Sequence, residues 1–116
     1  MNKWKFGVDN DKLVSLVLNG KKTATTSIYN GTVEEIGTKS VLIFDDGKDA
    51  CIIQNVDNVI IEFKNVKWDI AKLEGENNSL EEWRENHYKF FSKINNKFNE
   101  NTLVLIELFE VVEKFR

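Results

Sequence analysis

The chain has 116 residues, which suits a single domain spanning residues 1–116. Hydrophobic residues make up 41% and charged residues 30%, a balance that provides a sizeable core and argues against extended disorder. The net charge of −3 argues against nucleic acid wrapped over a broad basic surface, although a small basic site remains compatible with it.

Single cysteine and histidine residues limit the chemistry further. Cys51 permits no internal disulfide, and His87 alone cannot form a multi-histidine metal site, so we expect no metal and no cofactor. No apolar run approaches the roughly 18 residues of a membrane span, and no signal-peptide pattern opens the chain. We therefore expect a reduced, cytoplasmic protein with no membrane partner.

The first half of the chain predicts one helix followed by strands. Acidic and amide residues at 9–11 can cap a helix that Gly20 ends, after a short extended segment at Trp4. The lysine- and threonine-rich stretch continues as a strand to residue 29. Two β-rich runs around an Asp-Gly pair, at residues 40–53, predict a hairpin.

The second half predicts the remaining elements. A further β-rich run covers 59–63, and apolar spacing over 66–73 predicts a short helix. Ser79 begins a capping box for a helix with apolar residues at helical spacing over 80–94. The continuous apolar run 103–112 predicts a central strand covered on both faces and bent at its glutamates. The sum is an α+β domain in which a small closed or nearly closed barrel can form.

The stretch from Gly20 to Ser27 is the main chemical feature. A glycine after a periodic segment normally ends a helix, so the residues that follow pass from a helix end into a strand. Two primary amines beside several hydroxyls can hold an anion, or can activate a hydroxyl. The alternative interpretation is an exposed turn that leads into an edge strand.

Several features in order resemble the ASCH domain (activating-signal-cointegrator homology) of the PUA-like superfamily. They are the first helix, Gly20-Lys21-Lys22-Thr23-Ala24-Thr25, the Asp-Gly hairpin, the Glu74-Gly75-Glu76 turn, the segment Ser79–His87 and the closing strand. The Trp-Arg-x-x-His part of Ser79–His87 is similar to the small stand-alone bacterial branch. The resemblance implies a PUA-like β-barrel of about five or six strands flanked by about three helices, with a cleft whose floor includes the Gly-x-Lys strand.

The resemblance also implies a ligand, RNA or a modified nucleoside. Some small members of the family are amidohydrolases that remove the acetyl group from acetylated cytidine, with a lysine, a threonine three residues later and a distant glutamate as the catalytic set. Carried over by position, this set is Lys22, Thr25 and Glu76, with Glu74 as the competing acid. The arginine usually found two residues after the threonine is Ser27 here, so a guanidinium grip on a phosphate or base is absent.

Further side chains are expected to contact the ligand: Lys21, Thr23, Ser27, Glu74, Arg84 and His87. Arg84 and His87 lie three apart on one helix, so they can face the cleft together. The alternative for His87 is a packed, hydrogen-bonded histidine on the apolar stripe of that helix. Lys22 can activate the threonine only as a neutral amine, a form that burial or a neighbouring cation favours.

The first functional hypothesis is therefore a metal-independent amidohydrolase acting on acetylated cytidine. The second is a non-catalytic RNA-binding module in which the lysines contact phosphate, so that binding weakens steeply with salt. A third is a ribonuclease, in which His87, being the only histidine, would need acid–base partners of another type. A protein-interaction domain is a fourth.

Overall fold

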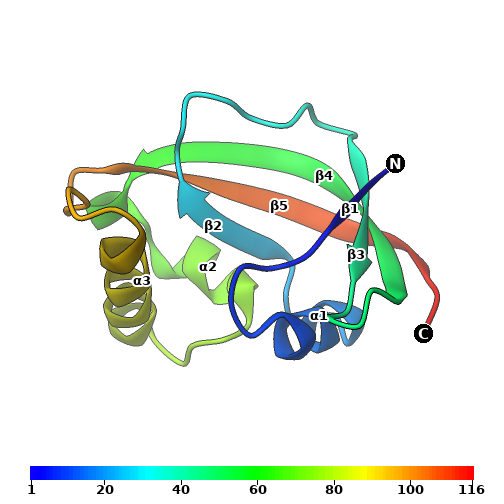
Figure 1. Ribbon diagram of the computed structural model, residues 1–116. Coiled ribbons are helices and arrows are strands. Elements are labelled where there is room, and N and C mark those ends of the chain that lie inside the picture. The colour runs from blue at the N-terminus through cyan, green and yellow to red at the C-terminus, as the bar shows by residue number, and fades with distance from the viewer.

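A five-stranded mixed sheet forms the frame of the molecule, with its strands in the order β1-β3-β4-β5-β2 (Figure 1). The computed structural model describes residues 1–116. The strands are β1 (Asn2–Trp4), β2 (Ala24–Ile28), β3 (Lys39–Ile43), β4 (Asp49–Glu62) and β5 (Leu103–Lys114). Only the β1–β3 pair is parallel. The α+β class expected from the sequence is confirmed.

The barrel closure expected from the sequence is not found. Strands β1 and β2 form the two edges of the sheet, and no ladder joins them. Both edges are short, three and five residues, so neither offers a long row of backbone groups for mutual pairing. The result is an open sheet whose two edge strands are not hydrogen-bonded to each other.

Strand β4 unites two runs that the sequence suggested as separate strands. The predicted break near Asp57 is instead a register shift between Asn55 and Asp57 within one 14-residue strand. A second shift follows Ile52, opposite the far end of β5. Such bulges increase local twist and bend, and they let two long strands curve together without a turn.

Helix α1 (Asn10–Leu18) connects the two edge strands, and α3 (Leu80–Ile94) packs beside the other end of the sheet (Figure 1). Between β4 and α3 lie the single 3₁₀ turn η1 (Phe63–Asn65), the short helix α2 (Trp68–Ala71) and the 3₁₀ turn η2 (Lys72–Glu74). The Ser79 hydroxyl accepts a hydrogen bond from Glu82 N at 3.1 Å, as the capping box predicts.

Two hydrophobic clusters stabilise this arrangement. One joins α1 to β3, β4 and Phe109 of β5; the other joins α2 and α3 to Val104 and Ile106 of β5. Strand β5 therefore contributes to both, and three consecutive residues, Val104 to Ile106, are buried. This confirms the expectation of a strand covered on both faces. None of the helices has the length and apolar character required to span a bilayer.

Candidate functional site

A cavity of about 360 Å³ opens where β2, the turn after η2, α3 and the segment preceding α1 meet. The side chains that line it include Lys22, Thr25, Glu74, Glu76 and His87. The structure thus brings the lysine, the threonine and both competing glutamates of the sequence analysis to one concavity. The amine is inside the protein, because the Lys22 side chain is only 1% exposed.

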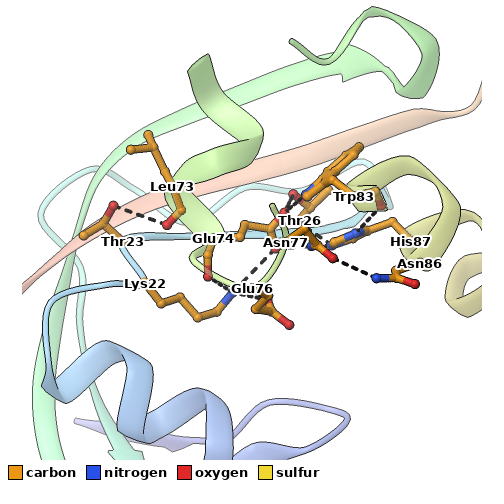
Figure 2. Close-up of polar contacts among 10 residues, drawn as sticks. All are labelled: Lys22, Thr23, Thr26, Leu73, Glu74, Glu76, Asn77, Trp83, Asn86 and His87. Carbon is orange, nitrogen blue, oxygen red and sulfur yellow. Dashed lines mark hydrogen bonds and ion pairs between the residues drawn. The ribbon is translucent and has the colours of Figure 1, made fainter. Parts of the chain in front are cut away.

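The backbone explains how a lysine comes to be buried here. Gly20, at φ +82°, ends α1, and the backbone N–H groups of Lys21 and Lys22 both donate to the Leu16 carbonyl. Thr23 N then donates to the Leu73 carbonyl at 2.8 Å, which ties the chain entering β2 to η2. The Lys22 side chain is therefore delivered directly against the turn that carries the two glutamates (Figure 2).

The Lys22 ammonium lies between two carboxylates. Its Nζ is 2.9 Å from Glu76 Oε2 and 3.5 Å from Glu74 Oε1. It also lies 5.3 Å from the centroid of the Phe6 ring, which provides a cation–π contact. Glu76 is the more accessible acid, with a side chain 26% exposed against 3% for Glu74. Glu76 is therefore placed between the amine and solvent.

Glu74 is buried within a set of donors. Its Oε2 accepts from the Thr26 hydroxyl at 3.0 Å and from the Trp83 indole N–H, and His87 Nε2 lies 3.3 Å from Oε1 (Figure 2). Burial opposes ionisation of this carboxyl, but the hydrogen bond and charge of His87, then the charge of Lys22, outweigh it. The pKa of Glu74 is consequently lowered, so the group is a stable buried anion.

His87 faces an acceptor with each ring nitrogen. Nδ1 lies 2.8 Å from the Trp83 carbonyl, and Nε2 faces the Glu74 carboxylate. Only the imidazolium can donate to both. Burial works against that charge, but the hydrogen bond and negative charge of Glu74 prevail and raise the pKa of His87. The ring also stacks on Trp83 at 4.3 Å, so His87 is both packed and cavity-lining.

The remaining predicted contacts lie outside this cavity. Lys21 is exposed, and the Thr23 hydroxyl points to the Leu73 carbonyl at 3.5 Å. Ser27 lines a neighbouring cavity. Arg84 donates to the carbonyls of Lys64 and Val66 at 2.9 and 2.8 Å, so its guanidinium holds the η1 turn against α3.

Two participants were missed by sequence reasoning. Thr26, rather than Thr25, bonds Glu74, and the Trp83 indole donates to the same carboxylate. The spacing of α3 placed Trp83 in the core, which is correct, since it is 0% exposed. The missed signal was chemical: a buried indole N–H requires an acceptor, and an acid in the preceding turn can provide it.

The fold and cavity together define an α+β protein with a buried lysine–glutamate centre at a helix-to-strand junction. The ASCH domain matches residues 2–113, and the chain belongs to this family. Among solved structures, an ASCH domain from Lactobacillus crispatus is 29% identical, with a TM-score of 0.89, covering 97% of this chain and 79% of that one.

Protein EF3133 from Enterococcus faecalis is 26% identical, with a TM-score of 0.85, covering 98% of this chain and 81% of that one. A tyrosine-to-phenylalanine mutant of the ASCH protein from Zymomonas mobilis shares the fold at 11% identity and a TM-score of 0.61, covering 99% of this chain and 70% of that one. No curated protein matches the chain. ASCH domains are in general associated with RNA or nucleosides.

Proposed function

We propose that this ASCH protein binds an RNA base or a nucleoside in the cavity and hydrolyses the acetyl amide of acetylated cytidine. Family membership supports the class of ligand. The observation that supports the reaction is the Lys22–Glu76 ion pair of 2.9 Å inside a cavity that Thr25 also lines. No hydrogen bond within the chain engages the Thr25 hydroxyl, so it is available to a bound molecule.

The chemistry assigns a separate role to each of the three groups. The Thr25 oxygen attacks the acetyl carbonyl carbon while its proton passes to the Glu76 carboxylate. The Lys22 ammonium, held between carboxylates, donates to the oxyanion that forms. The carbon–nitrogen bond then breaks, Glu76 returns the proton to the departing cytosine nitrogen, and water hydrolyses the acetyl-threonine to acetate.

The alternative of a non-catalytic RNA-binding module places different demands on the lysines. A phosphate contact requires an accessible cation, whereas the Lys22 amine is buried and already paired with carboxylates. Lys21 is exposed and can contact phosphate. Steeply salt-dependent RNA binding that depends on Lys21 and is accompanied by no turnover favours this alternative. Cleavage of an RNA oligomer by the wild type favours the ribonuclease.

The test is to incubate the purified chain with acetylated cytidine and to follow cytidine and acetate by chromatography. We expect turnover by the wild type and a loss of at least about 100-fold in Lys22→Met and Thr25→Val. Lys21→Met is the matched control, because it removes an adjacent, exposed amine and should retain activity. Circular dichroism checks that each variant folds. No turnover by the wild type, or equal turnover by Lys22→Met, contradicts the proposal.

A further inference from the structure

A second cavity, of about 270 Å³, shares Thr25 with the first. It lies over β2, β4 and β5, beneath the segment that connects β2 to β3. Its polar lining includes Ser27, Asn55 and Glu107, and Leu105 and Phe109 contribute apolar wall. A concave site that combines apolar wall with convergent polar groups is the usual form of a ligand site.

Asn55, which lines this cavity, has a buried acceptor that no group of the chain engages. The residue is 7% exposed, and its Nδ2 donates to Asn58 Oδ1 at 2.8 Å. Asn58 Nδ2 in turn donates to the Glu34 carbonyl at 2.8 Å, which fixes Asn58 Oδ1 as the acceptor and therefore fixes the orientation of the Asn55 amide. Asn55 Oδ1 is left buried without a hydrogen-bond partner. Such a group favours a ligand that brings a donor.

Glu107 supplies a second acceptor beside the reacting group. In the β2–β5 ladder it pairs directly with Thr25, and cross-strand partners point their side chains to the same face of a sheet. Burial, and then the negative charge of Glu34, raise the pKa of Glu107. A ligand that donates a hydrogen bond offsets this cost of the charged form, and the carboxylate, once ionised, accepts hydrogen bonds without donating any.

We propose that this second cavity holds a cytosine ring through its exocyclic amino nitrogen, with Glu107 and Asn55 as the acceptors. The inference rests on the proposed function and specifies its substrate. In acetylated cytidine that nitrogen keeps one N–H, which the acceptors engage, while its acetyl group extends past Thr25 toward Lys22. Uracil presents an oxygen at the same position, so the two acceptors exclude it. The apolar walls suit a planar ring.

The test measures binding rather than turnover. Cytidine and uridine are titrated into the isotope-labelled chain, and dissociation constants are taken from amide chemical shifts. We expect cytidine to bind about tenfold more tightly than uridine and to shift the amides of Asn55 and Glu107. Glu107→Gln should lose most of this preference, because its amide can turn an N–H toward the uridine oxygen. Glu110→Gln, an exposed glutamate on the same strand, is the matched control and should retain it.

Equal affinity for the two nucleosides, no binding of either, or an unchanged preference in Glu107→Gln overturns the inference. The chemical-shift changes of the wild-type chain are sufficient for the test even if a variant fails to fold. If acetylated cytidine is turned over but the amide chemical shifts change only outside this cavity, the inference is rejected and the proposed reaction is retained. A cytidine preference without turnover supports it and rejects the reaction. A parallel titration with single-stranded oligocytidine shows whether the base comes from a free nucleoside or from RNA.

Discussion

Lys22 Nζ lies 2.9 Å from Glu76 Oε2, although 54 residues separate the two in the sequence. Backbone contacts hold the two residues together: Thr23 N donates to the Leu73 carbonyl, and Gly75 packs against the Lys21 carbonyl. The two sides of the cavity are thus joined by backbone directly beneath the ion pair. Changes to that backbone should disturb the site more than changes at its rim.

Gly75 should tolerate no side chain. Its φ is +74°, and an added Cβ would lie 2.3 Å from the Lys21 carbonyl oxygen. We expect Gly75→Ala to lower the free energy of unfolding by about 3 kcal/mol, because strain and a backbone clash act together. Gly47→Ala is the control: φ is +87° there with nothing within 4 Å, so the loss should be about 1 kcal/mol. Equal losses in urea denaturation contradict the clash.

The two adjacent threonines of β2 should separate stability from function. Thr26→Val removes a 3.0 Å hydrogen bond to the buried Glu74 anion, which should cost about 2 kcal/mol in urea denaturation. Thr25→Val removes a hydroxyl that has no hydrogen-bond partner within the chain, from a residue that lines both cavities, and should change stability by less than about 0.5 kcal/mol. Turnover of acetylated cytidine should instead be lost in Thr25→Val. A larger destabilisation by Thr25→Val than by Thr26→Val is the opposite result.

The two glutamates should differ in their contribution to stability. Glu74→Gln removes the charge that Lys22 and His87 share in a fully buried position, and we expect a loss of about 3 kcal/mol. Glu76 is partly exposed, so Glu76→Gln should cost no more than about 1 kcal/mol. Chemical denaturation near pH 6 compares them. A greater loss of stability in Glu76→Gln than in Glu74→Gln would contradict the role of Glu74 as the main partner of the buried charges.

Stability should be greatest between about pH 4.5 and 6.5 as far as the Glu74–His87 pair determines it. The pKa of Glu74 is lowered from 4.5, so its contribution is present above that value and is lost as pH falls through the folded-state pKa. The pKa of His87 is raised from 6.5, so its contribution is present below that value and is lost as pH rises through the folded-state pKa. Urea midpoints measured from pH 3 to 9 give the profile. In His87→Gln the decline on the alkaline side should disappear, and its persistence would assign that decline to another group.

Most of the fold was accessible from the sequence because its signals are local. The Asp-Gly turn, the Ser79 cap and the apolar run of β5 each act within a few residues, and each matches the structure. Whether the sheet closes into a barrel and whether β4 is one continuous strand depend instead on contacts between residues far apart in the sequence. The sequence around Asp57 predicts the end of a strand. In the structure β4 continues through a bulge between Asn55 and Asp57, because it pairs with β5 on either side of that bulge. The residue pattern of one strand alone does not predict which strand it pairs with.

Less of the candidate site could be predicted from the sequence, because the directions in which its side chains point depend on backbone dihedral angles. Glu74 and Glu76 remained alternatives in the sequence; the left-handed Gly75 between them lets both carboxylates reach Lys22. The i, i+3 spacing of Arg84 and His87 predicted a shared direction. Arg84 instead donates to the carbonyls of Lys64, in the η1 turn, and of Val66, just after it, and these bonds direct its guanidinium away from the cavity.

Glu74 has its oxygens committed to Thr26, Trp83, His87 and Lys22. Of the two glutamates in this cavity, only Glu76 therefore keeps a partly exposed carboxylate that a visiting molecule can meet. Under the proposed function, a ligand reaches the buried Lys22 amine past the Glu76 side chain, which is the exposed member of the ion pair. Glu74 can keep its contacts with Thr26, Trp83 and His87 while such a ligand binds, so the buried part of the site needs no rearrangement.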